Sequence, residues 1–130
     1  MTNCVIHETA GPRSDRIMVI LLLKILPSPS KRRELLDILR SVVGPTSIQP
    51  GCRACEIYEG SGDDQTVLYL EQWDALTQIQ RHIQSALYVN ILTAIEFSTT
   101  QPEIKFYEIS QVWGMELLKT LRTEEGVINK

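Results

Sequence analysis

The junction between a predicted strand and a predicted helix, over residues 66–82, is the feature that most constrains how this sequence can fold. Side chains alternate between the two faces of a strand, so every second residue shares a face. One face of this strand carries Val67, Tyr69, Glu71 and Trp73, and the other carries Leu68, Leu70 and Gln72. A carboxylate is therefore expected between two large aromatic side chains on one side of a sheet.

The helix after this strand should pack against the sheet from its first turn. Asp74 is expected to cap its N-terminus, because an aspartate carboxylate accepts hydrogen bonds from the free amides of a first turn. Ala75, Ile79 and His82 recur at helical spacing and share one stripe. This stripe predicts that the imidazole of His82 lies on the packed side of the helix.

A continuous apolar run over residues 17–26 predicts the first strand, which ends at Pro27 and Pro29. A strand with one solvated face would alternate between apolar and polar residues, and this run does not. Both of its faces are therefore expected to be covered, by helices or by another subunit.

The segment after this strand is predicted to be a helix that begins at Ser28 and Pro29, with Ser30 as a competing cap. Its apolar stripe consists of Leu35, Leu39, Val42, Val43 and Thr46. Gly44 and Pro45 are expected to kink or end it, because proline lacks the amide that a helix needs.

The remaining patterns complete the order of elements. Residues 52–59 predict a strand, and the turn residues 60–64 predict that it forms a hairpin with the strand over residues 66–73. A further helix is expected after Ser85, and residues 103–109 predict a fourth strand. The apolar stripe of that helix is Tyr88, Ile91, Leu92 and Ile95. The order β-α-β-β-α-β predicts an α+β, ferredoxin-like fold with a four-stranded antiparallel sheet.

The predicted domain covers residues 16–110, between two terminal segments. Residues 1–15 are expected to form a flexible N-terminal arm. Residues 111–130 are expected to form an extra helix and tail, with the helix docked on the domain through Trp113, Leu117, Leu118 and Leu121.

Composition excludes several classes of function. The chain has 130 residues, of which 43% are hydrophobic and 22% charged, as in one globular domain. Its net charge of −3 and lack of a basic stripe argue against nucleic acid as a partner. It has no apolar run of membrane-spanning length, and its first fifteen residues lack a secretory signal. A cytoplasmic protein without a membrane partner is therefore predicted.

Two of the three cysteines, Cys52 and Cys55, have the spacing of a redox or zinc motif. Redox pairs of this kind lie at helix N-termini, and a structural zinc ion needs four ligands. On a regular strand these residues would point to opposite faces. We therefore expect reduced thiols, no metal site, and at most one cysteine facing a cavity.

His82 and Glu71 are the candidate acid–base residues. The ordinary pKa of histidine, near 6.5, suits proton abstraction at neutral pH, although a histidine on an apolar stripe is more often structural. An inward-facing Glu71 is consistent with a base of raised pKa or with a structural ion pair to Arg53 or Lys105. We favour the structural role for Glu71.

Four aromatic residues could line a pocket for a flat apolar ligand or simply fill the core: Trp73, Tyr69, Tyr58 and Tyr88. The sequence has no nucleophile elbow, phosphate loop, dinucleotide-binding fingerprint or paired-histidine metal motif. Hydrolase, kinase and nicotinamide-dependent functions are therefore not supported.

Together these features resemble the antibiotic biosynthesis monooxygenase domain, which includes small quinol monooxygenases. The resemblance spans about residues 16–110. It depends on the element order, on residues 50–52 before the second strand, on residues 71–73 ending the third, and on His82 after Trp73. It implies a homodimer in which two sheets pack face to face as an α+β barrel.

The resemblance also implies a chemistry. Some members oxidise polycyclic aromatics or quinols with molecular oxygen and no cofactor, in a cavity between the sheet and the helices. Trp73 would then be a cavity wall and hydrogen-bond donor, and His82 the base or the group that orients the substrate. Tyr69, Glu71, Tyr58, Tyr88 and Cys55 would contact the substrate.

The sequence departs from this family at positions that bear on activity. Leu87 takes the place of a second histidine found in many relatives, and Cys55 takes the place of a frequent tyrosine. Residues 19–23 and 91–95 lack the asparagine and histidine that related haem-degrading enzymes use.

The leading hypothesis from the resemblance is a cofactor-independent monooxygenase acting on a small aromatic or quinol-type molecule. The alternative is a non-catalytic dimeric protein that binds or regulates through the same scaffold.

Overall fold

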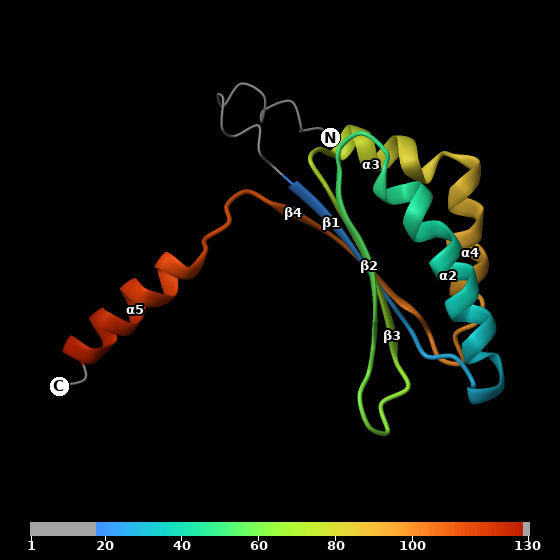
Figure 1. Ribbon diagram of the computed structural model, residues 1–130, viewed down its shortest axis with the longest axis horizontal. Coiled ribbons are helices and arrows are strands. Elements are labelled where there is room, and N and C mark those ends of the chain that lie inside the picture. The colour runs from blue at the N-terminus through green and yellow to red at the C-terminus, as the bar shows by residue number, and fades with distance from the viewer. Residues whose placement is uncertain (1–17, 129–130) are drawn as a thin grey trace.

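A four-stranded antiparallel sheet with helices on one face forms the body of the protein (Figure 1). The computed structural model describes residues 18–128, so the predicted arm over residues 1–15 lies outside the described residues. The elements follow the order β-α-β-β-α-β expected from the sequence. The predicted α+β, ferredoxin-like fold is therefore confirmed.

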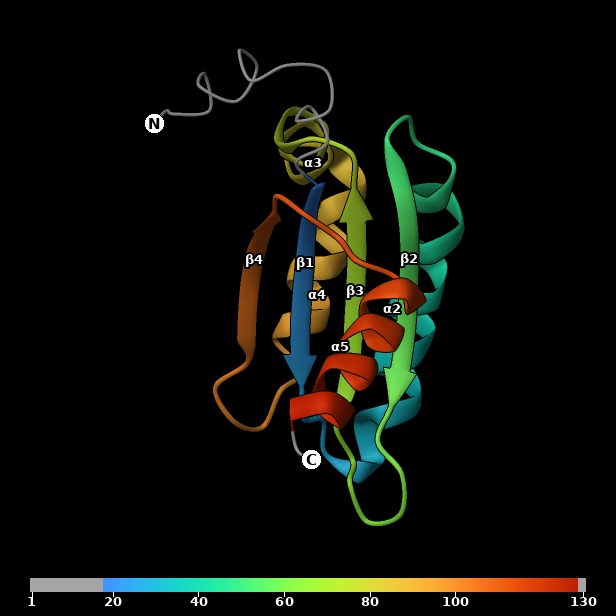
Figure 2. The same cartoon turned by 90° about the vertical axis from the view of Figure 1, so that its left-hand side faces the viewer.

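The strands are β1 (Met18–Ile25), β2 (Cys52–Glu59), β3 (Val67–Trp73) and β4 (Glu103–Ile109). They lie side by side in the order β2-β3-β1-β4, which places β1 and β3 at the centre (Figure 2). β2 and β3 pair as the predicted hairpin. The central position of β3 explains why its inward side chains are fully buried.

The helical elements of the body are η2 (Pro29–Lys31), α2 (Arg32–Ser47), α3 (Leu76–Ile83), η3 (Ala86–Tyr88) and α4 (Val89–Ile95). They cover one face of the sheet (Figure 1). The core lies between the two layers, where Leu21 and Leu23 of β1 meet Leu35 and Leu39 of α2. All four side chains are fully buried.

Of the two expected effects of Gly44 and Pro45 on the first helix, ending it at the proline does not occur, whereas the kink stays a prediction. α2 continues through Pro45 and ends at Ser47, before Pro50. The missing amide frees the carbonyl of Ser41, which lies on an exposed residue where water can replace the lost bond. The N-cap of α3 is Ala75 rather than Asp74, because the carboxylate of Asp74 pairs with Arg53 of β2. The amide of Ala75 instead donates to the side-chain oxygen of Gln78, at 3.1 Å.

The second face of the sheet is open. Alternate residues of β1 are buried against the helices, whereas Met18, Ile20 and Leu22 are partly exposed and Lys24 is exposed on the other side. We call this second side the open face; its residues on β3 are Leu68, Leu70 and Gln72, which pair with those of β1. A single chain thus covers one of the two apolar faces of β1, and cover for the other remains a prediction.

The C-terminal helix α5 (Met115–Ile128) stands away from the body, on the side of the open face (Figures 1 and 2). Trp113, Leu118 and Leu121 are 50–56% exposed. The predicted helix is present, but the prediction that it docks on its own domain is wrong. No helix within residues 18–128 has the length and apolarity needed to cross a membrane.

Candidate functional site

A fully buried carboxylate, Glu71, is the centre of the polar cluster between sheet and helices. Its Oε2 accepts a hydrogen bond from the Tyr69 hydroxyl at 2.5 Å and lies 3.0 Å from Nε2 of His82. Its Oε1 accepts a hydrogen bond from the indole Nε1 of Trp73 at 2.9 Å. We call Tyr69, Glu71, Trp73 and His82 the Glu71 cluster. Every member is at most 1% exposed.

Local sequence explains how these side chains meet. Tyr69, Glu71 and Trp73 are alternate residues of β3 and therefore share its helix-covered face. α3 begins directly after the strand, and its buried stripe of Ile79 and His82 turns toward that face. The cluster thus arises from one continuous stretch of chain, as the junction in the sequence predicted.

The contact with Glu71 sets the orientation of the His82 ring. An ionised carboxylate can only accept hydrogen bonds, and Tyr69, Trp73 and His82 can all donate to it. His82 then carries its proton on Nε2, which leaves Nδ1 with a free lone pair. Nδ1 is buried and has no hydrogen-bond partner within the described residues. An imidazole held in one tautomer by an acidic neighbour, with its other nitrogen unpartnered, is the arrangement that general bases use.

Aromatic rings enclose this imidazole. The Trp73 ring is tilted by 35° relative to it, with 5.1 Å between centroids, and the Tyr88 ring meets it edge-on at 5.4 Å. Tyr88 is 4% exposed. Burial raises the pKa of the Tyr88 phenol to about 12, so this hydroxyl stays protonated at neutral pH. His82 therefore packs against two aromatic rings in addition to its contact with Glu71.

The cluster extends to Cys55 on β2. Its thiol donates to the Tyr69 hydroxyl at 3.2 Å, and that hydroxyl donates to Glu71. Burial raises the pKa of the Cys55 thiol to about 12 and also raises the pKa of Tyr69. Both groups are thus neutral donors at pH 7, and they form a chain of hydrogen bonds directed at the carboxylate.

The position of Cys52 corrects the prediction that the two cysteines point to opposite faces. A bulge between Cys52 and Ala54 shifts the register of β2 by one residue, so that Cys52 lies opposite Trp73 and Cys55 opposite Glu71. Both cysteines therefore share the helix-covered face, as free thiols. Burial raises the pKa of Cys52 as well, which opposes thiolate chemistry.

The described residues contain no group of three or more potential metal ligands.

Glu71 does not pair with either of its predicted partners, and Tyr58 lies away from the Glu71 cluster. Glu71 pairs with His82, and neither Arg53 nor Lys105 reaches it, because Arg53 pairs with Asp74 and Lys105 lies opposite Leu22 on the open face. Tyr58 lies on the open face too, where it is 49% exposed and donates to Glu56. Tyr58 follows Cys55 by three residues, and residues three apart on a regular strand face opposite sides. The separation of Tyr58 from Cys55 could therefore have been predicted from the sequence.

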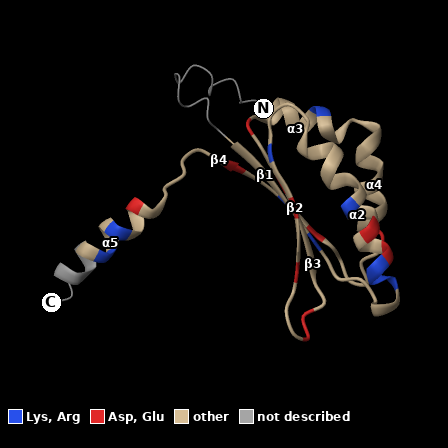
Figure 3. Ribbon diagram, viewed as in Figure 1, with Lys and Arg blue, Asp and Glu red and all other residues tan. Residues whose placement is uncertain are grey.

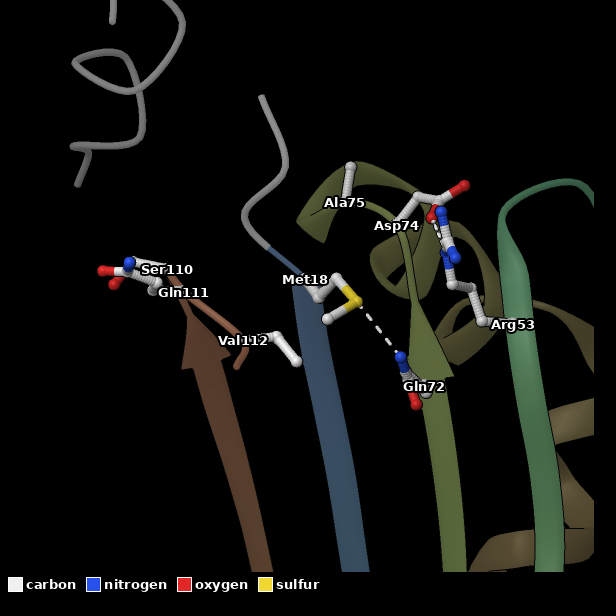
Figure 4. Close-up of a pocket in the computed structure, with 8 residues that line it drawn as sticks. All are labelled: Met18, Arg53, Gln72, Asp74, Ala75, Ser110, Gln111 and Val112. Atoms are coloured by element: carbon white, nitrogen blue, oxygen red, sulfur yellow. Dashed lines mark hydrogen bonds and ion pairs between the residues drawn. The ribbon is translucent and has the colours of Figure 1, made fainter. Parts of the chain in front are cut away.

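A cavity of about 720 Å³ lies elsewhere, at the end of the open face (Figure 4). Its lining residues come from β1, β2, β3, the turn between β3 and α3, and the segment after β4: Met18, Arg53, Gln72, Asp74, Ala75, Ser110, Gln111 and Val112. Gln72 donates to the sulfur of Met18 at 3.0 Å. The sheet separates this cavity from the Glu71 cluster, which is closed to solvent. The chemistry of the cluster makes it the better candidate site.

Comparison with known proteins assigns the chain to a family. The model of the family described as antibiotic biosynthesis monooxygenase matches residues 18–94. The chain belongs to this family. A monooxygenase-like family is therefore established, and the matched region contains every member of the Glu71 cluster. α5 lies beyond it.

Several individual proteins are similar to this family member. Rv0793 of Mycobacterium tuberculosis, whose name provisionally describes a monooxygenase, is 26% identical over 84 residues, which cover 65% of this chain and 82% of Rv0793. The structure of Rv0793 has a TM-score of 0.63 at 20% identity and covers 75% of this chain and 97% of its own. A conserved protein from Methanosarcina mazei has a TM-score of 0.66 at 21% identity, covering 74% and 96%. These structures confirm the fold.

Proposed function

We propose that the protein is a cofactor-independent monooxygenase that acts on a small aromatic or quinol-type substrate, with His82 as its base. The observation that carries this proposal is the buried pair of Glu71 and His82, in which Nδ1 of His82 has no hydrogen-bond partner among residues 18–128. A buried unpaired acceptor is costly, so a group that donates to it on binding relieves that cost.

The proposed reaction begins with proton transfer. Nδ1 of His82 accepts the proton of a phenolic or enolic hydroxyl, and Glu71 stabilises the imidazolium that forms. The resulting electron-rich anion transfers electrons to molecular oxygen. One oxygen atom then enters the ring system as a quinone oxygen, and the other leaves as water with two hydrogens of the substrate. Trp73 and Tyr88 hold the ring in place.

Access to the cluster is the main structural requirement of this proposal. Trp73 and His82 are each 1% exposed, so the side chains packed around them must move before a substrate reaches Nδ1. Tyr88 lies on the short element η3, between two helices, and its ring edge covers the imidazole. Among the enclosing residues it belongs to the shortest helical element, and we expect it to move first.

Oxygen uptake with a panel of hydroquinones and anthrones tests the enzyme proposal. Removal of a general base costs about 10²–10⁴-fold in rate, so His82→Ala should lower turnover by at least about 100-fold. Trp73→Phe removes the hydrogen bond to Glu71 and should lower it less. Circular dichroism of each variant checks that the fold persists. Turnover by the native protein at the background rate would rule out the proposal.

A second candidate function is non-catalytic binding on the same scaffold. Its support is the enclosed state of the cluster, together with Leu87 and Cys55 at positions where many relatives have a histidine and a tyrosine. Thermal-shift measurements with the same aromatic panel separate the two functions. Stabilisation without oxygen consumption favours binding, whereas consumption that depends on His82 favours catalysis.

We propose further that the protein is a cytoplasmic homodimer in which two open faces pack together as an α+β barrel. The partly exposed apolar residues Ile20, Leu22 and Leu70 support this assembly, because central strands rarely leave such residues in water. Sedimentation equilibrium at micromolar concentration tests it, and a monomer there would contradict it.

A further inference from the structure

We propose that α5 is an exchanged arm, so that in a pair of copies each α5 packs against the other copy and not against its own domain. This inference rests on the two-copy assembly proposed above and adds to it the segment that holds the copies together. α5 lies beyond the residues that the family model matches, 18–94.

The first evidence is the exposure of the segment that begins α5. Val112, Trp113, Met115, Leu118 and Leu121 are each exposed by 50–66%. Leu117, Leu118 and Leu121 recur at helical spacing, so one side of the helix is apolar. Exposed apolar side chains gathered on one segment mark an interaction surface.

The second evidence is the direction in which the chain leaves the sheet. After β4 the segment over residues 110–114 carries α5 out on the side of the open face, at an angle to the sheet (Figures 1 and 2). Ser110, Gln111 and Val112 line one side of the cavity of about 720 Å³ and are exposed (Figure 4). The linker therefore leaves room beside the open face.

The third evidence is the area that a stable pair needs. Four strands of seven or eight residues offer a footprint of about 450 Å². A typical stable interface buries about 800 Å² on each partner. A helix of 14 residues adds about 200 Å² of its own surface and covers about as much of the copy it contacts. The open face and α5 together reach the usual size, whereas the open face alone does not.

Symmetry and charge favour a second copy of this chain as the occupant. The open face and α5 lie on the same side of one chain. A single two-fold axis can therefore bring both surfaces of each copy into contact with the other copy. The basic residues Lys119 and Arg122 follow Glu116 along α5, with charges of both signs as on the strands (Figure 3). A strongly acidic or basic partner is not favoured by such a surface.

A dilution series with two readouts tests the exchange. Sedimentation equilibrium gives the dissociation constant of the pair, and the emission of Trp113 reports burial of the arm. The Trp113→Phe variant isolates the emission of the core residue Trp73, which is 1% exposed and should not respond. We expect the Trp113 contribution to shift to longer wavelength as the pair dissociates.

The double variant Leu118→Glu and Leu121→Glu should weaken the pair by at least about tenfold, because each change places a charge in the apolar contact. Thr123→Glu is the control for added charge, since Thr123 lies on the side of the helix away from Leu118 and Leu121, and it should leave the dissociation constant within about twofold. These positions lie outside the core, so the fold should persist in both variants.

The outcomes separate this inference from the proposals on which it rests. An unchanged dissociation constant in the double variant overturns the exchange while the dimer stands. Burial of Trp113 that does not depend on concentration also overturns it, because the arm then folds onto its own sheet. A monomer at every concentration overturns both exchange and dimer, whereas oxygen uptake tests the catalytic proposal independently.

Discussion

At the scale of single residues, the acceptor role of Glu71 dominates the candidate site. Glu71→Gln keeps the shape of the side chain but turns one acceptor into a donor that faces Tyr69, Trp73 and His82. We expect a loss of about 2–4 kcal/mol in the free energy of unfolding, since buried donors are left unpaired. Glu96→Gln, at the exposed C-cap of α4, is the matched control and should cost less than about 0.5 kcal/mol. Denaturant unfolding measures both, and equal values would contradict the central role of Glu71.

The buried thiol and phenol make the protein sensitive to alkaline pH. Cys55 and Tyr88 have pKa values raised from 9.0 and 10.0 to about 12. A raised pKa means that the folded state holds the proton more tightly, so its stabilising effect is complete below about pH 9 and is lost as the pH rises toward 12. The melting temperature should therefore fall steadily above pH 9. Cys55→Ala should reduce the slope of that fall, and an unaltered slope would contradict the assignment to Cys55.

At the scale of elements, two glycines near α2 have opposite requirements. Gly51 has a φ of +88° after the helix, and a Cβ there would meet the side chain of Gln78, which caps α3. Gly44 lies within α2 with open space around it. Gly51→Ala should cost about 1–3 kcal/mol, and Gly44→Ala should add about 0.5–1 kcal/mol. Thermal unfolding of the two variants checks the signs, and a stabilised Gly51→Ala would refute the backbone argument.

Most elements could be predicted from the sequence because their signals are local. Strand alternation placed Tyr69, Glu71 and Trp73 on one face, and the helical stripe placed His82 on the packed side. The bulge before Ala54 has no such signal, and it moved Cys52 to the face of Cys55. The pairing of Arg53 with Asp74 across the hairpin likewise depends on tertiary structure.

The contact between Glu71 and His82 marks the limit of sequence reasoning about the site. The sequence identified each residue as a candidate. Their pairing depends on the angle at which α3 crosses β3, and neither strand alternation nor helical spacing specifies that angle. Lys105 was an equally reasonable partner for the carboxylate until the register of β4 placed it on the open face. Side-chain direction within an element was predictable, whereas contacts between elements were not.

At the scale of the whole molecule, the open face should control assembly and leave the fold unaffected. Leu22 lies at the centre of that face, opposite Leu70 of β3 and Lys105 of β4, and points away from the core. Leu22→Glu places a charge where the proposed partner sheet packs, and a buried unpaired charge costs several kcal/mol. We expect a folded monomer at concentrations where the native protein is dimeric. The variant differs from those in α5 because it acts on the sheet contact itself.

The control for this prediction is Arg33→Glu, which changes charge on the solvent side of α2 and should leave the dimer intact. Sedimentation equilibrium measures the mass of each variant, and near-ultraviolet circular dichroism of Trp73 reports whether the core is retained. If Leu22→Glu stays dimeric, the copies associate through another surface, and the open face must then be covered by the chain itself or by a different partner. If it unfolds, the face belongs to the core of an obligate dimer, in which folding and association are one process.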